Sequence, residues 1–390
     1  MVPNRVFVVI ITYNGEKDIG ELLKTYKAYT PSSVMLIIVD NASSDTTVDI
    51  AQREYPDTIF IQNTENQGYA GGARQGMEYA YAQGATIIAV LNQDMRLTKN
   101  WLEPLVEMLN TSPQCAAVQP RIMLYPNTDR INSYGNTIHF LGFGYTLGYQ
   151  KIACHSEQEL LARLVREESR IDHEKTTTGS LTCVRDDKEY SCEEKKELVS
   201  CSGAAVVFRA SALEEVGYID NKFFLYYEDS DLSWRLRLRG YQLLLCCGST
   251  VYHRYEFSRS IQKFYYMERN RLVMMLKNYS FKTLCLMAPM FWIMECGMLG
   301  FSLFGTILGK RDSLTLREKI RSYAFFFKIS TWRYLLKERA VVQRTRKISD
   351  KESTKLFCDV IEFQDIDNPL LRYIVNPLTR MYWRAIRWLV

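Results

Sequence analysis

Four short apolar runs, separated by longer amphipathic segments, occupy the first hundred residues. The runs cover residues 6–11, 34–39, 58–62 and 86–91. Uninterrupted apolar runs of this kind are typical of strands buried on both faces of a parallel sheet. Helices are expected between them, over about 17–29, 46–55 and 75–83. This alternation predicts an α/β fold with a Rossmann-like, open, mostly parallel sheet that carries helices on both faces.

A polar residue follows each of the four predicted strands. These residues are Thr12, Asp40, Asn63 and Asp94. Open α/β sheets bind ligands outside the carboxyl ends of their strands, where all four side chains are expected. One polar residue at a strand end is commonplace, but four at the same edge of a sheet predict a binding site.

The chain after residue 100 has a less regular pattern. We expect a helix over 101–110 and irregular structure with short strands over 119–148. A charged surface insertion over about 150–197 follows, helical over 157–170. Beyond it we expect a short helix capped by Ser211, a helix over 232–239 ended by Gly240, and strands over 241–247 and 251–253. In or beside the insertion stand His155, His173, Cys183 and Cys192. Their spacing matches no zinc site, so an exposed loop is the favoured interpretation.

Composition narrows the protein class only modestly. The 390 residues are 47% hydrophobic, which allows two domains or one large domain with an appendage. The net charge of +5 gives no indication of a nucleic-acid partner. Ten cysteines without C-x-x-C spacing argue against zinc, and no secretion signal stands out. We therefore expect an unsecreted protein with free thiols.

The C-terminal region, residues 263–390, is expected to be helical and to associate with a membrane. Residues 284–308 carry one charge, Glu295, and are long enough to span a bilayer. Positive charge on both sides, together with Pro289 and several glycines, favours a hairpin entering one leaflet or helices lying in the interface. Residues 380–389 mix cations with indoles, as interfacial helices do. A buried core helix with a basic solvated face is the alternative.

A carboxylate at a strand end, an acidic cluster and a late histidine suggest the chemistry. Asp94 lies just beyond a buried strand, an acidic cluster runs from Glu228 to Asp231, and His253 follows. Such a set can form a divalent-metal site with a general base beside it, which suits transfer of a group from a diphosphate. Crowding among the carboxylates of the acidic cluster can raise one pKa, as a base requires. Asp231 precedes Leu232 and is expected to cap the helix.

These motifs together resemble family 2 glycosyltransferases of the GT-A fold, of the bacterial surface-polysaccharide type that includes rhamnosyltransferases. The resemblance covers about residues 5–279. It rests on Ile11–Asn14, Val39–Asp45, Asn66–Arg74, Asn92–Asp94, Tyr227–Asp229 and His253. It implies a nucleotide-sugar-binding half over 1–125 and an acceptor-binding half over 126–262.

The resemblance also implies roles for individual residues. Nucleotide-sugar binding would fall to Thr12, Tyr13, Asn14, Asp40, Asn41, Asn66, Gly68, Arg74, Asn92 and Gln93; acceptor binding to Ser202, Gly203, Ala204 and Tyr227. Asp94 and His253 would bind Mg²⁺ or Mn²⁺, although Asn92 stands where many members have a first aspartate. Asp229 would be the base, with Glu228 orienting the loop. Three alternatives stay open: a turn role for Asp40, an exposed helix position for Arg74 and a hydrogen-bonded strand-end role for His253.

The activity implied is that of a metal-dependent inverting glycosyltransferase. It would move a sugar from a nucleoside-diphosphate sugar to a hydroxyl of a glycan or lipid-linked acceptor, at the cytoplasmic face of the membrane, as a peripheral or monotopic protein. Two rival functions are a nucleotidyltransferase, whose Gly-rich basic loop is missing after the first strand, and a non-catalytic sugar-binding protein. The identity of the sugar, the base and the oligomeric state does not follow from the sequence.

Overall fold

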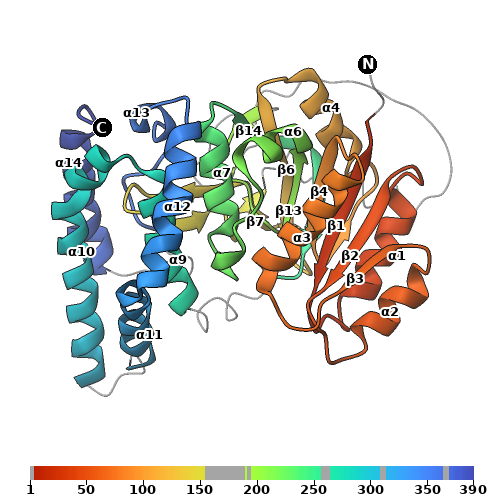
Figure 1. Ribbon diagram of the computed structural model, residues 1–390, viewed down its shortest axis with the longest axis horizontal. Helices are drawn as coiled ribbons and strands as arrows, with labels where there is room; N and C mark the ends of the chain where they lie inside the picture. The colour runs from red at the N-terminus through yellow and green to blue at the C-terminus, as the bar shows by residue number, and fades with distance from the viewer. Residues whose placement is uncertain (1–3, 154–188, 191–194, 256–263, 308–312, 363–368) are drawn as a thin grey trace.

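The computed structural model describes residues 4–153, 189–190, 195–255, 264–307, 313–362 and 369–390 (Figure 1). Most of the predicted insertion lies outside the described residues. The same holds for its predicted helix and for His155, His173, Cys183 and Cys192.

The predicted β-α alternation at the N-terminus is confirmed. In chain order the elements are β1 (Val6–Thr12), α1 (Ile19–Tyr29), β2 (Met35–Asp40), α2 (Thr47–Glu54), β3 (Ile59–Gln62), α3 (Gly68–Ala82) and β4 (Ile87–Asn92). β1 lies between β2 and β4, and all pairs among these four strands are parallel. Helix α3 begins at Gly68, a full turn and more before the expected start.

The sheet continues with strands from the second half of the chain. Its order is β12-β14-β6-β13-β4-β1-β2-β3. The added strands are β6 (Cys115–Leu124), β12 (Lys195–Glu197), β13 (Ala205–Arg209) and β14 (Gln242–His253), with β5 (Met95–Leu97) and β7 (Ile131–Ser133) at its margin. β13 runs antiparallel to both of its neighbours, whereas β14 runs parallel to β6. The sheet is therefore mixed but mostly parallel.

Strand β6 replaces the irregular structure that was expected to begin at Gln119. All ten of its residues are buried. Its polar side chains have internal partners, which the sequence pattern does not reveal: Arg121 donates to Oγ1 of Thr250 at 2.9 Å, and Gln119 to the carbonyl of Ser133 at 3.2 Å. Buried polar groups are tolerated when they are hydrogen-bonded, so β6 lies in the core although its sequence contains polar residues.

Three smaller expectations change. The two C-terminal strands form one strand, β14, with an irregularity between Cys246 and Thr250. Ser211 lies inside α6 (Ala210–Val216) and does not cap it. Cys247 takes part in a disulfide, so the expectation of free thiols throughout is wrong.

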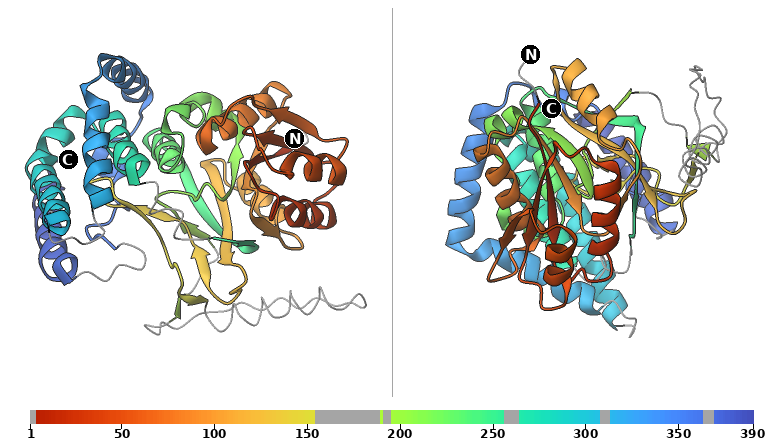
Figure 2. Two further views of the ribbon diagram at one scale, coloured as in Figure 1. Left: turned by 90° about the horizontal axis from the view of Figure 1, so that it is seen from below. Right: turned by 90° about the vertical axis from the view of Figure 1, so that its right-hand side faces the viewer.

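Helices cover both faces of the sheet, as predicted (Figure 2). Val9 and Val39 lie on the face of the sheet that is covered by α3 and α7 (Glu228–Leu238). Val8 and Ile38 lie on the other face, which is covered by α1 and α4 (Glu103–Thr111). Neighbouring strand residues point to opposite faces, so a continuous apolar run supplies both cores.

The C-terminal helices gather at the end of the molecule away from β3 (Figure 1). They are α9 (Phe264–Asn278), α10 (Phe281–Ile307), α11 (Ser313–Ala324), α12 (Ile329–Thr345), α13 (Asp350–Ser353) and α14 (Asn376–Ile386). Helix α10 continues through Pro289 as one helix, so of the two expected arrangements the hairpin is wrong, and placement in the interface stays a prediction. Residues Phe281–Leu303 are long and apolar enough to cross a membrane, and most of their side chains are not buried in the fold.

Buried ion pairs join these helices to the sheet domain. Nζ of Lys277 in α9 lies 2.6 Å from Asp220 and 3.1 Å from Asp231, which also pairs with Arg235 at 2.9 Å. Asp231 is therefore a buried charge within α7, not its cap. The helix begins three residues earlier, and Tyr227 occupies the N-cap position with φ = 68°.

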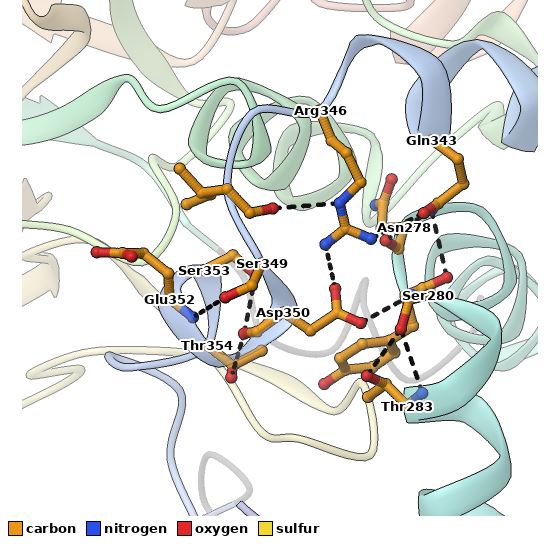
Figure 3. A network of polar contacts seen from close by, with 12 residues as sticks. Asn278, Ser280, Thr283, Gln343, Arg346, Ser349, Asp350, Glu352, Ser353 and Thr354 are labelled. Carbon is orange, nitrogen blue, oxygen red and sulfur yellow. Dashed lines mark hydrogen bonds and ion pairs between the residues drawn. The ribbon is translucent and has the colours of Figure 1, made fainter. Parts of the chain in front are cut away.

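A second polar network fixes the start of α10 (Figure 3). The Asp350 carboxylate accepts from the backbone N–H of Ser280 at 2.8 Å and pairs with Arg346. Gln343 of α12 donates to the carbonyl groups of Lys277 and Asn278, both at 3.1 Å. The C-terminal helices are thus integral to the folded unit, and truncating them would disturb α9.

Candidate active site

Thr12 and Asp40 meet at the carboxyl ends of β1 and β2, as predicted. Oγ1 of Thr12 donates to Oδ1 of Asp40 at 3.3 Å, and both residues are buried. Ser43 donates to the same carboxylate with its backbone N–H, at 3.0 Å, and with its hydroxyl. Asp40 is fully buried and accepts three internal hydrogen bonds, so it organises the β2–α2 turn beneath the edge of the predicted nucleotide site.

Asn41 and Asn66 hold the N-terminus of α3. Nδ2 of Asn41 donates to the carbonyl of Gly68 at 2.8 Å, and Oδ1 of Asn41 accepts from Asn63 at 3.0 Å. Oδ1 of Asn66 accepts from the backbone N–H of Gly68 at 2.8 Å. The structure thus gives both amides an internal positioning role at the edge of the predicted nucleotide site.

Gly68 has no room for a side chain. Its φ is 72°, and an added Cβ would lie 2.2 Å from the carbonyl oxygen of Phe224. We expect Gly68→Ala to destabilise the fold by about 1–3 kcal/mol, through strain and displacement of the Phe224 loop. Thermal unfolding measures this. Gly20→Ala is the matched control, because its Cβ would meet only Ile50 at 3.5 Å. Equal melting temperatures for the two variants would contradict the prediction.

Gln93 and Asn14 stabilise the loop that follows β1. Oε1 of Gln93 accepts from the backbone N–H of Tyr13 at 2.8 Å, and its Nε2 donates to the Tyr13 carbonyl at 3.1 Å. Oδ1 of Asn14 accepts from the N–H of Ser44 at 2.9 Å. Tyr13 is 44% exposed, so its side chain faces outward from this loop, as do those of Asn14 and Glu16.

Arg74 forms an ion pair within its own helix. Its Nε lies 2.8 Å from Glu78, and both side chains are substantially exposed. This geometry supports the alternative interpretation of Arg74 as a surface residue of α3.

Asp94 and His253 are brought together across 159 residues of sequence. Nε2 of His253 lies 3.1 Å from Oδ1 of Asp94, and Nδ1 lies 3.0 Å from Oδ1 of Asn132. β5 positions the pair, because Met95 lies opposite His253 in the antiparallel register of β5 and β14. An amide oxygen can only accept, so in this orientation of the Asn132 amide Nδ1 carries the proton. A neutral Nε2 then presents a lone pair toward the Asp94 carboxylate, an arrangement that a cation bound by both would stabilise.

This donor set fits a divalent cation. A histidine whose Nδ1–H donates to an oxygen presents Nε2 as a ligand, the usual arrangement at metal sites. Asp94 adds a carboxylate oxygen, which suits Mg²⁺ or Mn²⁺. Among the described residues no group of three or more His, Cys, Asp or Glu side chains could hold a metal. A cation here would therefore take its other ligands from water and from phosphate oxygens.

Asn92 ends β4 with one unsatisfied polar atom. Its backbone N–H donates to the carbonyl of Ala204 at 2.9 Å, while its buried Oδ1 has no partner in the described part of the chain. Buried acceptors are rarely left without a donor, so a water molecule or a ligand group is expected to donate to this oxygen.

Asp229 lies in the first turn of α7, where its carboxylate accepts several hydrogen bonds. Oδ2 accepts from the N–H of Gly203 at 2.9 Å and from Nδ2 of Asn136 at 3.3 Å, and Oδ1 accepts from the N–H of Ser230 at 2.6 Å. Burial nevertheless raises the pKa of Asp229. Burial and the Asp229 charge also raise the pKa of Glu228, whose Oε2 has no partner among the described residues.

The predicted acceptor-site residues 202–204 form a loop between Asp229 and Asn92. The N–H of Ser202 donates to Oε1 of Gln119 at 2.6 Å, and the Gly203 carbonyl accepts from the Tyr69 hydroxyl. Burial raises the pKa of Tyr69, which keeps that hydroxyl protonated. The Tyr227 hydroxyl accepts from the N–H of Gly144 at 2.9 Å, and burial raises its pKa to about 12.

Four supporting residues did not emerge from the sequence: Tyr69, Gln119, Asn132 and Asn136. The two asparagines lie four positions apart near β7 and β8 (Asn136–Ile138), one contacting His253 and the other Asp229. The only available signal was the high asparagine content of 119–148, which indicates turns as readily as a site.

Comparison with known proteins identifies the family. Residues 7–217 match the family model described as Glycosyl transferase family 2, which is more than half of the chain. The chain belongs to glycosyltransferase family 2. The matched region of this family 2 chain includes Asp94 and the 202–204 loop; Asp229 and His253 lie beyond it.

Sequence relatives and a solved structure agree with the assignment. The family 2 chain is 25% identical over 240 residues to the poly-beta-1,6-N-acetyl-D-glucosamine synthase of Staphylococcus aureus, covering 60% of this chain and 46% of the relative. It is 22% identical to the low-salt glycan biosynthesis hexosyltransferase Agl10 of Haloferax volcanii, covering 61% and 64%. The chain thus spans about half to two thirds of these curated relatives.

The crystal structure of GalNAc-T7 with UDP, GalNAc and Mn²⁺ superposes with a TM-score of 0.51 at 15% identity, covering 72% of this chain and 49% of the other. The fold of the family 2 chain is GT-A, as predicted.

Proposed function

We propose that the protein is an inverting glycosyltransferase that moves a sugar from a nucleoside-diphosphate sugar to a hydroxyl of a glycan or lipid-linked acceptor, in cell-surface polysaccharide synthesis. One observation carries the proposal: the Asp94–His253 pair and Asp229 are joined by two short structural links. The first is the loop of residues 203–204, in which the N–H of Gly203 donates to Asp229 and the carbonyl of Ala204 accepts from the N–H of Asn92. The second is the segment between Asn132 and Asn136.

Asp229 is the group proposed to accept the proton. The acceptor oxygen attacks the anomeric carbon and forms the new glycosidic bond. The bond from that carbon to the diphosphate breaks, and the nucleoside diphosphate leaves with the electron pair. The hydroxyl proton passes to Asp229, whose raised pKa makes it a better base than an exposed carboxylate. Gly203 and Asn136 hold the carboxylate in place.

Asp94 and His253 are the residues that would hold Mg²⁺ or Mn²⁺ beside the diphosphate. The cation would supply charge stabilisation for the departing diphosphate. Asn132 orients the His253 ring through Nδ1. Thr12 and Asp40 would shape the nucleoside site from beneath, and Asn92 would face it.

A nucleotide-sugar screen tests the proposal. Purified full-length protein is incubated with uridine-, guanosine- and thymidine-diphosphate sugars, including rhamnose, with Mg²⁺ or Mn²⁺ and saccharide acceptors, and nucleoside diphosphate release is measured. We expect release that depends on both acceptor and metal. Binding of a donor without release under any acceptor would favour a non-catalytic sugar-binding protein.

Membrane contact at the cytoplasmic face is the second part of the proposal. The C-terminal helices expose large apolar side chains, among them Phe281 (75% exposed), Phe327 (88%) and Ile329 (73%). Lys282 and Lys328 lie directly beside them in the chain. Exposed rings mixed with cations are typical of surfaces that dock on anionic lipid. Such docking would bring a lipid-linked acceptor to the catalytic domain.

Replacing Phe327 and Ile329 together by serine is expected to weaken binding to anionic vesicles by about tenfold or more, since each large apolar side chain contributes about 1.5–3 kcal/mol when buried. Vesicle sedimentation measures this. Tyr79→Ser, which removes an exposed ring from α3, is the control. A double variant that sediments like the control would argue against this docking surface.

A further inference from the structure

The loop that leads into α7 has an unusual backbone conformation. Phe224, Tyr226 and Tyr227 have φ values of 65°, 68° and 68°. Residues with a Cβ rarely adopt positive φ, and bulky ones do so only where the surrounding structure holds them there. Three such residues within four positions, directly before Glu228 and Asp229, therefore require support from another part of the chain.

The tightest point of this loop is a γ-turn centred on Phe224. The ψ of Phe224 is −60°, and the N–H of Leu225 donates to the carbonyl of Phe223 at 2.7 Å. A γ-turn with positive φ at its centre is rare and strained. The carbonyl of Phe224 accepts from the N–H of Ala70 at 3.1 Å. The turn therefore lies against the first residues of α3, at the edge of the predicted nucleotide site.

A single side chain of α9 binds the carbonyl groups of this loop. Asn270 is 1% exposed, and its Nδ2 donates at 2.9, 2.9 and 2.7 Å to three backbone carbonyls, those of Phe223, Leu225 and Tyr226. Its Oδ1 accepts from Nε of Arg269 at 2.8 Å. A guanidinium can only donate, so this contact orients the amide with its NH₂ group toward the loop. Arg269 also donates to the carbonyl of Phe223, at 2.7 Å.

The same helix is joined to both ends of the loop. Before the loop, Asp220, whose side chain caps η1 (Asn221–Phe223), lies 2.6 Å from Nζ of Lys277. After the loop, Asp231 lies 3.1 Å from the same nitrogen. Asn270 and Lys277 are seven residues apart and so lie on one face of α9. This face therefore holds the segment on either side of the strained turn as well as the turn itself.

We propose that Asn270 is a positioning residue of the transfer reaction: by binding the carbonyls of the strained loop, it sets where the carboxylate of Asp229 lies relative to the acceptor hydroxyl. The inference rests on the proposed glycosyltransferase function. The first turn of α7 continues from the loop, and the N–H of Asp231 donates to the carbonyl of Tyr227 at 2.8 Å. A change in the loop backbone therefore moves Asp229 with it. Misplacing a reacting group by about 1 Å can lower the rate by about 10²-fold.

The test compares Asn270→Ala with Gln343→Ala in the full-length protein. The two are matched, because Nε2 of Gln343 also donates to three backbone carbonyls, those of Lys277, Asn278 and Tyr279, at the end of α9 away from the loop. A similar fall in Tm is therefore expected in both variants. We expect kcat for nucleoside diphosphate release to fall by about 10–100-fold in Asn270→Ala and to stay near the wild-type value in Gln343→Ala. Donor affinity, measured by calorimetry with the nucleotide-sugar that gives the fastest release in the screen, should change by less than about twofold in both, because Asn41 and Asn66 hold α3 independently.

A double variant separates positioning from a general loss of structure. If Asn270 acts through Asp229, adding Asn270→Ala to Asp229→Asn should lower turnover little further, because the base is already lost. Fully additive losses overturn the proposal, as does a kcat that is unchanged in Asn270→Ala or equally reduced in Gln343→Ala. Should Asn270→Ala fail to fold, Asn270→Ser, which keeps one hydroxyl donor, is put through the same comparison and judged by the same outcomes. A wild-type protein that releases no nucleoside diphosphate with any acceptor contradicts the glycosyltransferase function, and this inference with it, whereas an active wild type with these negative outcomes contradicts the positioning role alone.

Discussion

Asp229→Asn is expected to lower kcat by about 10²–10⁴ while leaving donor affinity near that of the wild type, because an amide cannot accept the proton of the acceptor hydroxyl. The loss should appear in kcat more than in donor binding, since the proton is transferred in the transition state. Steady-state nucleoside diphosphate release and calorimetric donor titration measure the two quantities.

The contacts of Asp229 define the controls. Both carboxylate oxygens accept from donors, so the NH₂ group introduced by Asp229→Asn would confront the N–H of Gly203 or of Ser230. Some loss of stability is therefore expected, and thermal unfolding separates it from loss of catalysis. Asn136→Ala removes one of these contacts and keeps the carboxylate, so it should retain most of its turnover. An Asp229→Asn enzyme with near-wild-type turnover would rule out the assignment and move the base to Glu228.

The pH profile of the wild-type enzyme follows from the same site. A base acts only when it is deprotonated, and burial raises the pKa of Asp229 above that of an ordinary aspartate. Activity should therefore rise with pH through this raised pKa, and fall away below it. The acid limb should be lost in the residual activity of Asp229→Asn but retained in Asn136→Ala.

Local pattern alone predicts strands β1 to β4 well. Strands β1 and β4 are almost wholly buried because both faces of the sheet are covered, and an unbroken apolar run of strand length is typical of that environment. Strand β6 was missed because Gln119 and Arg121 interrupt its apolar pattern. Their partners, Ser133 and Thr250, come from other parts of the chain. Such long-range hydrogen bonds are invisible in local periodicity.

The sequence likewise predicts the position of some residues of the candidate site and not the role of others. Strand ends placed Thr12 beside Asp40, and the family resemblance placed Asp94 beside His253, as the structure has them. Residue type alone could not separate ligand-binding amides from structural ones. Gln93 is the example: its side-chain amide bonds twice to the backbone of Tyr13, although its position in the motif suggested contact with the donor. Asp231 likewise looked like a helix cap, and its buried cationic partner Lys277 lies 46 residues away.

Asp94→Ala is expected to abolish the metal-dependent part of donor binding, a loss of about 10²-fold or more, because Asp94 supplies the only carboxylate of the pair. His253→Ala should weaken binding of Mn²⁺ and donor by about 10–100-fold, and Asn132→Ala by less, since Asn132 only orients the imidazole through Nδ1. Donor titrations with and without Mn²⁺ measure the coupling between the two ligands. Calorimetry of Mn²⁺ with the nucleoside diphosphate alone gives a readout that does not depend on turnover.

The order of these effects distinguishes the two interpretations of His253. If His253 is only a strand-end histidine held by Asp94 and Asn132, its removal should lower the melting temperature and leave the metal dependence of donor binding unchanged. If Nε2 is a ligand, metal dependence should fall in both His253→Ala and Asp94→Ala, and the double variant should lose little more than Asp94→Ala alone, because both residues act on one cation. Fully additive losses would instead mean that the two side chains act at separate places, and the shared metal site would have to be abandoned.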